Sequence, residues 1–339
     1  MELTTVWFSL IAVLWIGYFV LEGFDFGVGM LLPVLSRNDT ERRVVINTIG
    51  PVWDGNEVWV LVAGGATFAA FPEWYATLFS GFYLPLLLIL VALIVRGLAF
   101  EYRAKRDEAL WKARWDKAIF FGSLLPAILW GVAFANIVRG VPIDADKEYV
   151  GSTLTLLNPY GLLGGLTTLG LFLTHGALFL ALKTDGDIRH RARALGIKLG
   201  LGTAVVAVGF LVWTQFLTGS FGSAALFVGA ALALVAGLFA AYEGREGWAF
   251  IGTFATIGLA VAGLFVALFP DVMPSSLDAA WSLTTTNASA TDYTLKIMTW
   301  VAVLFTPIVL MYQGWTYWIF RKRISVHHIP TAELAQQGS

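Results

Sequence analysis

The sequence contains no cysteine. Disulfides, thiolate metal sites, iron–sulfur clusters and cysteine nucleophiles are therefore excluded, because each needs the sulfur atom itself. Charged residues are scarce as well, at 13% of the 339 residues, against about 25% in an average soluble domain. The formal net charge is -1, so no basic surface for a nucleic acid is indicated. These absences exclude an ordinary water-soluble enzyme and a nucleic-acid-binding protein.

Apolar residues, by contrast, make up 58% of the chain, and the mean hydropathy is +0.73. They occur in repeated blocks separated by short charged clusters, which indicates many membrane spans and no separate soluble head. The first residues, MELTTVWFSL, have neither a basic start nor a small-residue cleavage signal, so an uncleaved first span is expected. The sequence predicts an all-α polytopic membrane protein with residues 1–339 in a single integral membrane domain.

A membrane helix needs about 20 mostly apolar residues. On this basis we expect about nine spans, near residues 5–32, 49–71, 75–100, 118–139, 158–182, 196–217, 222–241, 248–269 and 293–320. Pro33, Pro72 and Pro270 stand where helices are expected to stop, and Asn158 followed by Pro159 is typical of a helix start. Two four-helix bundles plus one additional helix would suit the short connections.

The Lys and Arg residues predict the orientation of the spans, because positively charged connections stay in the cytoplasm. Eighteen of the 22 lie on the odd-numbered connections and the C-terminal tail, namely Arg37, Arg42, Arg43, Arg103, Lys105, Arg106, Lys112, Arg114, Lys117, Lys183, Arg189, Arg191, Arg193, Lys198, Arg245, Arg321, Lys322 and Arg323. With nine crossings, the N-terminus is expected outside and the C-terminus in the cytoplasm. An eight-span arrangement would break this alternation.

Ionisable residues inside the predicted spans are the most informative feature. They are Glu22 and Asp25 in LEGFDFGVG, Asp54 and Glu57 in VWDGNEVW, and Arg96 and Glu101 in VRGLAFEYR. Each charge costs roughly 2.5 to 3.5 kcal/mol at the centre of a membrane helix. We therefore expect the four acids to face the protein interior, to be paired or to be protonated.

Helix geometry places these acids at one level. Asp25 lies a little before the cytoplasmic end of the first span, and Asp54 lies a similar number of residues after the cytoplasmic start of the second. At the rise of an α-helix, both are expected roughly 10 Å below the cytoplasmic surface of the membrane. Arg96 is the expected counter-charge for either. Two interpretations remain open: a buried arginine–carboxylate network that only fixes helix packing, or a route for protons or cations that opens toward the cytoplasm.

Other motifs are better explained by packing. Gly23 and Gly27, the pair Gly64 and Gly65, and the pair Gly164 and Gly165 are predicted at close helix contacts. His175 is the one histidine within a span. A bis-histidine haem site would need a second, so we interpret His175 as a hydrogen-bonded packing residue.

Several motifs together resemble subunit II of the cytochrome bd quinol oxidases. They are GFDFGVGM, the segment from RNDTERRVVINTIG through WDGNEVW to FYLPL, VRGLAFEYRAK, FPDVMPSS, NASATDYTLKIMTW and FRKR. The resemblance covers essentially the whole chain and is densest over residues 20–120.

The resemblance implies a subunit of a bacterial inner-membrane terminal oxidase. Such an oxidase oxidises quinol and reduces dioxygen to water, with charge separation but without pumping protons. Two b haems, haem d and the quinol site are expected in subunit I, the obligate partner, so this chain alone would not be catalytic. Small single-span accessory subunits, membrane lipid and quinone are further expected partners.

The resemblance also suggests roles for individual residues. Asp25 and Asp54 match acids on a proton route from the cytoplasm toward the oxygen-reducing haem. Arg96 would be their counter-charge and Glu101 a proton-uptake group, while Glu57 stands where some members carry Gln. Supporting positions complete the expected site: Glu22, Trp53, Asn56 and His175.

Two other classes of function also accommodate intramembrane acids. A proton-coupled secondary transporter would need a substrate site near the midplane at broken helices, whereas these acids are expected nearer the cytoplasm. A scaffold subunit without proton traffic shares every sequence feature except the need for Asp25 and Asp54 to titrate. Neutral isosteres distinguish the scaffold from the relay.

Overall fold

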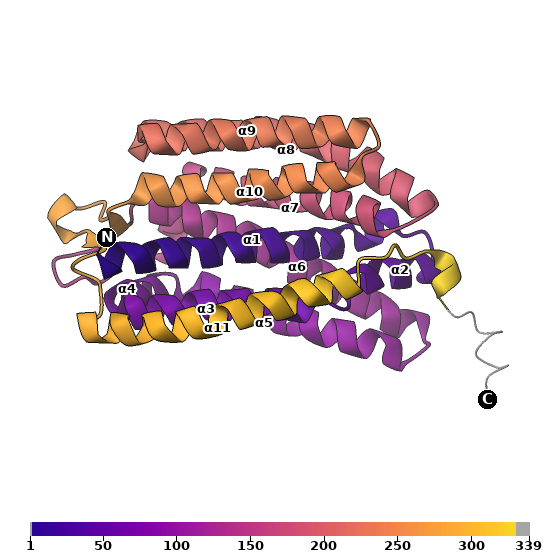
Figure 1. Cartoon of the computed structure of the whole chain (residues 1–339), viewed down its shortest axis with the longest axis horizontal. Coiled ribbons are helices and arrows are strands. Elements are labelled where there is room, and N and C mark those ends of the chain that lie inside the picture. Colours follow the sequence, from indigo (N-terminus) through magenta and orange to yellow (C-terminus); the bar gives the residue numbers. More distant parts are fainter. Residues whose placement is uncertain (1, 330–339) are drawn as a thin grey trace.

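The computed structural model describes residues 2–329, so residues 1 and 330–339 of the expected single domain lie outside the described part. Long helices running side by side form an elongated bundle (Figure 1). The helices are α1 (Leu3–Leu35), α2 (Asp39–Ile49), α3 (Trp53–Ala70), α4 (Pro72–Gly81), α5 (Tyr83–Tyr102), α6 (Ala109–Arg139), α7 (Pro159–Lys183), α8 (Asp187–Thr218), α9 (Phe221–Tyr242), α10 (Glu246–Leu268) and α11 (Asp292–Ile319). Strands β1 (Asp271–Met273) and β2 (Leu283–Thr284) pair antiparallel between α10 and α11.

The all-helical membrane class is confirmed, because eight helices within residues 2–329 are long and apolar enough to cross a membrane. Helix α3 is not apolar enough to be one of them, because it carries Asp54, Asn56 and Glu57 near its start. The expected span 75–100 is divided at Phe82 into α4 and α5, and α2 was not predicted at all. Nine crossings with the N-terminus outside therefore stay a prediction.

Three of the four expected helix boundaries are confirmed. Helix α3 ends before Pro72, α10 ends before Pro270, and α7 begins at Pro159, where the Asn158 side chain accepts a hydrogen bond from the Gly161 amide at 2.9 Å. The expected stop at Pro33 is wrong, since α1 continues through it to Leu35. A proline inside a helix removes one hydrogen bond and crowds the preceding turn, but the burial of Leu35 favours retention of this last turn.

Helix α1 lies at the centre of the bundle and packs against α3, α6, α7 and α10. Helices α5 and α6 pack together beside it, and α7, α8, α9 and α10 form a second packed group. Helix α11 contacts α1 and α3 at the edge of the bundle. Only 6% of its most apolar segment is buried within the described chain. Helices α1 and α6 both pack against α7, so the two sets of helices are joined along their length. The grouping into two four-helix bundles plus one additional helix therefore stays a prediction.

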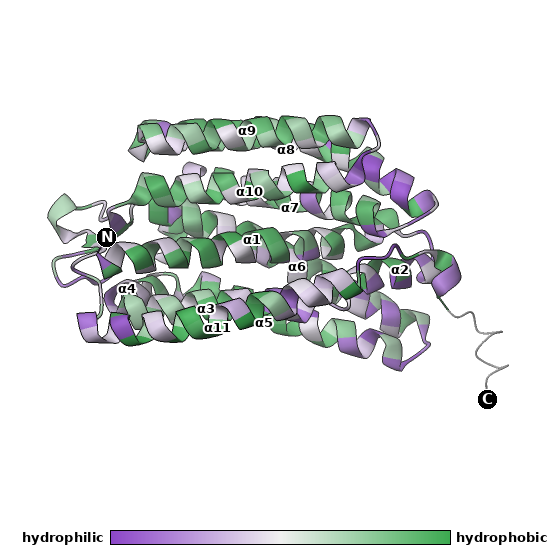
Figure 2. Ribbon diagram, in the orientation of Figure 1, coloured by the Kyte–Doolittle hydropathy of each residue, from purple (hydrophilic) through white to green (hydrophobic). Residues whose placement is uncertain are grey.

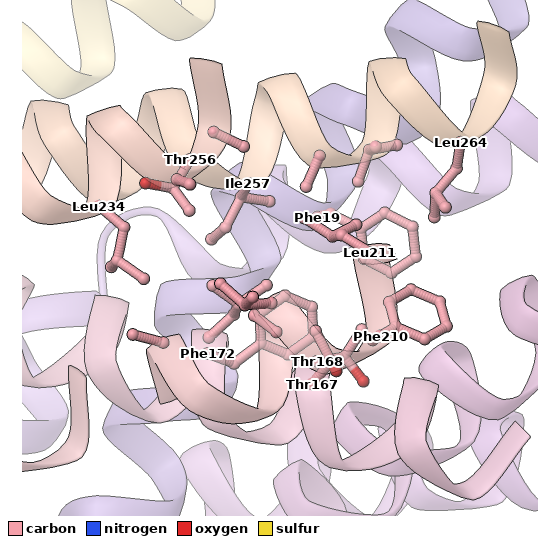
Figure 3. Close-up of a pocket in the computed structure, with 18 of the residues that line it drawn as sticks. Phe19, Thr167, Thr168, Phe172, Phe210, Leu211, Leu234, Thr256, Ile257 and Leu264 are labelled. Atoms are coloured by element: carbon pink, nitrogen blue, oxygen red, sulfur yellow. The ribbon is translucent and has the colours of Figure 1, made fainter. Parts of the chain in front are cut away.

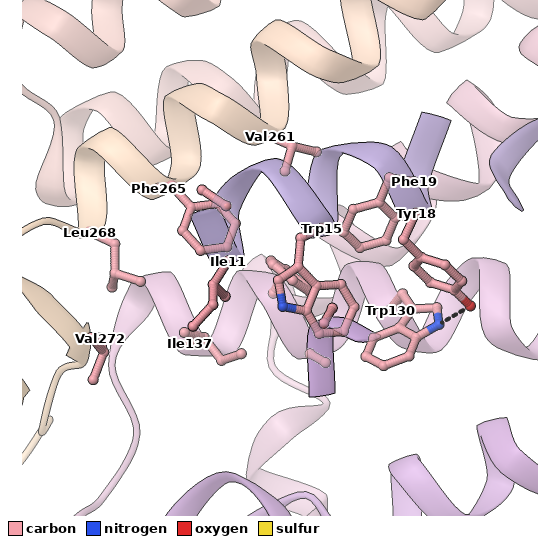
Figure 4. Packing of buried hydrophobic residues seen from close by; sticks show 14 of the residues in the cluster. Ile11, Trp15, Tyr18, Phe19, Trp130, Ile137, Val261, Phe265, Leu268 and Val272 are labelled. Atoms are coloured by element: carbon pink, nitrogen blue, oxygen red, sulfur yellow. Dashed lines mark hydrogen bonds between the residues drawn. The ribbon is translucent and has the colours of Figure 1, made fainter. Parts of the chain in front are cut away.

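Aromatic side chains fill the interface between α1 and α6 (Figure 4). The ring centroids of Trp15 and Trp130 lie 4.9 Å apart in an edge-to-face arrangement, and those of Trp15 and Phe134 are equally close. The Trp130 indole N–H donates to the Tyr18 hydroxyl at 3.1 Å. Because this polar contact is made inside the cluster, the Trp130 indole is buried with its donor satisfied.

Hydrophilic segments gather at the end of the bundle that contains α2 (Figure 2). There Asp39 accepts hydrogen bonds from Arg103 at 2.8 Å and from Lys112 at 3.2 Å. Burial raises the pKa of the Asp39 carboxyl, but these two cations outweigh burial and leave its pKa below the ordinary value. Because this end carries most of the Lys and Arg residues, it is the predicted cytoplasmic end.

The predicted close approach at Gly23 and Gly27 is confirmed, and the neighbour is α7. A Cβ atom at Gly27 would lie 2.0 Å from the Phe172 carbonyl oxygen and 2.8 Å from Gly176 Cα. Gly164 and Gly165 likewise face α6 closely. The expectation for Gly64 and Gly65 is wrong within residues 2–329, since nothing described lies within 4 Å of a Cβ at either.

We expect Gly27→Ala to separate α1 from α7, because backbone atoms that cannot move aside occupy the position of the new methyl group. The free energy of unfolding should fall by about 3 kcal/mol or more. Thermal unfolding of the purified protein in mild detergent measures this effect. Gly202→Ala on α8 is the matched control, since nothing lies within 4 Å there; equal melting temperatures for the two variants would contradict the prediction.

Candidate functional site

A fully buried arginine joins three helices in the interior. Arg96 on α5 donates through Nη2 to Glu22 on α1 and, at 3.2 Å, to Glu57 Oε2 on α3. Its guanidinium carbon lies 4.6 Å from the centre of the Phe26 ring, which is a cation–π distance. The sequence brings these groups together because Glu22 and Phe26, one helical turn apart, share a face of α1.

The prediction that Arg96 pairs with Asp25 or Asp54 is wrong. Asp25 is fully buried, but its Oδ2 accepts a hydrogen bond from the Asn56 amide Nδ2 at 2.7 Å. The cause is the order of polar residues on α3, where Asn56 and Glu57 face inward and leave Asp54 exposed. Glu22 and Asn56, expected only as supporting residues, are central to the site.

Asn56 connects Asp25 to α11. Its Oδ1 accepts from the Tyr317 hydroxyl at 2.7 Å and from Gln313 Nε2 at 3.3 Å. The Gln313 Oε1 in turn accepts from the Trp59 indole at 2.9 Å. Sequence reasoning missed Gln313 and Tyr317, although a glutamine within the apolar run of the last span was the available signal.

Several buried polar atoms of this cluster have no hydrogen-bond partner among residues 2–329: Glu22 Oε2, Asp25 Oδ1, Arg96 Nε and Arg96 Nη1. A merely structural network normally satisfies its buried polar atoms. The cluster contains three carboxyl groups, of Glu22, Asp25 and Glu57, and one guanidinium, of Arg96, so full ionisation would leave two uncompensated negative charges. Such excess charge in an apolar interior favours proton binding.

The remaining predicted site residues lie around this cluster. Asp54 and Glu101 are exposed on α3 and α5, and neither has a hydrogen bond or ion pair among the described residues. Trp53 packs on Phe100, with ring centroids 5.1 Å apart. The Glu57 side chain keeps 22% of its surface exposed, so it forms the accessible edge of the buried group.

His175 lies apart from the acids and packs as predicted. Its Nδ1 is 2.7 Å from the Thr253 hydroxyl, its Nε2 is 3.2 Å from the Val20 carbonyl oxygen, and its ring stacks on Phe250 at 4.5 Å. Because both ring nitrogens have partners inside the chain, His175 does not fit the role of a haem ligand.

A small cavity of about 60 Å³ lies between α7, α8, α9 and α10 (Figure 3). The side chains around it are almost wholly apolar. Its hydroxyls are already used: Thr167 donates to the Leu163 carbonyl, Thr168 to that of Ala127, and Thr256 to that of Gly252. With no free polar group to orient a reactant, this cavity is not the functional site.

Comparison with known proteins identifies the family. The sequence profile of the cytochrome bd terminal oxidase subunit II family matches residues 3–320. The chain is 45% identical over 330 residues to cytochrome bd ubiquinol oxidase subunit 2 of Bacillus subtilis (strain 168), covering 96% of this chain and 97% of that protein. It is 39% identical over 362 residues to cytochrome bd-I ubiquinol oxidase subunit 2 of Escherichia coli (strain K12), covering 96% of each.

The fold is also similar to a solved structure. A chain in the structure of bd oxidase from Geobacillus thermodenitrificans superposes with a TM-score of 0.77 and 18% sequence identity, over 95% of this chain and all of that one. At this identity the likeness concerns the fold alone. The sequence matches over nearly the full length decide the assignment: this chain belongs to the cytochrome bd terminal oxidase subunit II family.

Proposed function

We propose that this chain is the second subunit of a bacterial inner-membrane terminal oxidase that oxidises quinol and reduces dioxygen to water. The observation that carries this proposal is full-length membership of the family, whose relatives are named as subunits of ubiquinol oxidases. It implies a partner oxidase subunit and a complex that uses haem and quinol. The eight helices of residues 2–329 that are able to span a membrane suit such a multi-pass subunit.

We place the two b haems and haem d of the complex in the partner subunit, where they would supply electron transfer and dioxygen reduction. The engaged nitrogens of His175 support this placement, because the other histidines, His190, His327 and His328, lie at the charged end. The described chain would then contribute stability and protons. Small accessory subunits are part of the same proposal.

Within the complex, we assign the cluster of Glu22, Asp25, Glu57 and Arg96 to proton uptake. Protons from the cytoplasm would reach the exposed carboxylates of Glu101 and Asp54 first. Glu57, at the accessible edge, would pass a proton inward, and Asp25 Oδ1 is free to hold it. Arg96 limits the accumulated negative charge, so the cluster can exchange protons without becoming too costly to bury.

A packing-only network and a scaffold subunit are the competing interpretations. The unpartnered atoms of Glu22, Asp25 and Arg96 favour proton exchange over packing alone. The family assignment favours an oxidase subunit over a secondary transporter. The neutral isostere of Asp25, considered in the Discussion, separates the relay from the scaffold.

We further propose that the partner subunit covers the outer face of α3. Asp54, Val58, Leu61, Gly65 and Phe68 recur at helical spacing on this face and are exposed. A charged aspartate facing lipid is unfavourable, by up to roughly 2.5 to 3.5 kcal/mol at the helix centre. A protein neighbour with polar groups at that level would remove this cost, and it would place Asp54 between the two subunits.

The absence of cysteine makes a direct test simple. Leu61→Cys, at a side chain that is 68% exposed, provides one site for a photoactivatable cross-linker in native membranes. We expect a covalent product with a larger subunit, and a reduced-minus-oxidised spectrum of that product with haem b and haem d bands. Val205→Cys on α8, 76% exposed, is the control and should give no such product. A haem-free chain without a large partner would overturn the assignment.

A further inference from the structure

We propose that the charged end of the bundle contains a binding site for one anionic phospholipid, located between α7, α10 and the chain that follows α11. Two adjoining cavities, of about 410 and 470 Å³, share Thr48, Lys183 and Phe320 in their walls. Together they have the size of a small-molecule site. This proposal does not depend on the proton route.

One part of the site is basic. Lys183, Arg321, Lys322 and Arg323 line the two cavities, and neither cavity is lined by an acidic residue among residues 2–329. Arg323 is partly neutralised by Glu246, 3.6 Å away. Arg321 and Lys322 are exposed, and Arg321 makes a cation–π contact with Trp318. At least two cations thus remain for an anionic group from outside the chain.

The basic residues are held in place by the backbone. The Ile324 amide donates to the Lys183 carbonyl at 2.8 Å, and the Asp185 amide donates to the Ile324 carbonyl at 3.1 Å. The Lys183 ammonium also donates to the carbonyl oxygens of Phe320 and Lys322. The segment after α11 is therefore attached to the end of α7, which fixes the cations above the cavities.

The other part of the site is apolar. Leu21 and Phe24 on α1, Phe179 on α7, and Phe250 and Phe254 on α10 line the larger cavity. The rings of Phe24 and Phe179 stack at 4.1 Å, so this wall is formed before any ligand arrives.

The pairing of cations with a deep apolar wall selects the ligand. A free phosphate would leave the apolar part empty, and a neutral quinone headgroup would not use the cations. A phospholipid with a negatively charged headgroup satisfies both parts, and basic pockets at the cytoplasmic side of membrane helices bind such lipids. The location agrees, because this is the predicted cytoplasmic end.

The test uses the complete complex, extracted in mild detergent and exchanged into vesicles of phosphatidylglycerol and phosphatidylcholine in equal parts. Native mass spectrometry after re-extraction then counts the retained lipids. We expect retained phosphatidylglycerol, and loss of roughly tenfold or more of it in the Lys183→Gln, Arg321→Gln, Lys322→Gln triple variant. The matched control is Lys105→Gln, Arg114→Gln, Lys117→Gln, which removes the same charge from exposed positions at the same end.

Because Lys183 also anchors the chain after α11, the double variant Arg321→Gln, Lys322→Gln keeps the test valid if the triple variant fails to fold. It should still lose most of the phosphatidylglycerol. The proposal would be overturned if the double variant retained as much phosphatidylglycerol as the control. It would also be overturned if the unmodified complex retained phosphatidylcholine as well as it retains phosphatidylglycerol. Binding of inorganic phosphate that displaces the lipid would indicate a simple anion site and would also overturn it.

Discussion

Replacement of Arg96 by glutamine is expected to prevent accumulation of the folded chain. The substitution leaves Glu22, which is fully buried, and Glu57 without their shared cation. Breaking a buried ion pair by removing one partner costs about 3 to 5 kcal/mol, a large part of the roughly 5 to 15 kcal/mol that stabilises a typical protein. The amount of the two-subunit complex in membranes, and its melting temperature in detergent, measure the effect.

The cause of this loss can be isolated by removing the unpaired charge. We expect Glu22→Gln in the Arg96→Gln background to restore part of the stability, because a neutral amide costs less to bury than a carboxylate. Arg114→Gln, at an exposed position, is the matched control and should melt like the unmodified protein. If Arg96→Gln alone melted like this control, the ion pair would not stabilise the bundle.

Replacement of Asp25 by asparagine should lower oxygen consumption by the complex about a hundredfold, on the scale of a lost proton-transfer group. The asparagine can keep the hydrogen bond from Asn56, because its carbonyl oxygen can replace Asp25 Oδ2 as the acceptor. What it cannot do is take up and release a proton. The haem spectrum and the yield of complex should therefore stay unchanged while quinol-dependent oxygen uptake falls.

Two comparisons make this result specific to a relay. Asp25→Glu retains a carboxyl group and should retain more activity than Asp25→Asn. The Asp187 side chain is 81% exposed at the charged end of the bundle, so Asp187→Asn should have no effect on oxygen uptake. Full oxygen uptake with normal membrane potential in Asp25→Asn, or in Asp54→Asn, would favour the scaffold interpretation and overturn the relay.

Much of the fold followed from one-dimensional patterns. The apolar blocks predicted the long helices, and Asn158 with Pro159 predicted the start of α7, because membrane span length and helix capping depend on neighbouring residues only. The division of the expected span 75–100 at Phe82 was missed, since a mostly apolar run does not show where one helix ends and the next begins. Helix α2 was missed because it is too short and too polar to resemble a membrane span, and the apolar-block pattern detects only spans.

The sequence indicated the charged residues of the site but not their pairing. Charges within apolar spans need partners, which drew attention to Glu22, Asp25, Asp54, Glu57, Arg96 and Glu101, whereas Asn56 was expected only as a supporting residue and Asp54 and Glu101 are exposed. Which acid forms the ion pair with Arg96 depends on how α1, α3 and α5 are rotated about their axes, because acids less than one helical turn apart point in different directions. Packing sets that rotation: the close contact of Gly27 with α7 orients α1, and the buried Asn56 orients α3. Only the tertiary structure could therefore assign Glu22 and Glu57 to Arg96 and leave Asp54 on the surface.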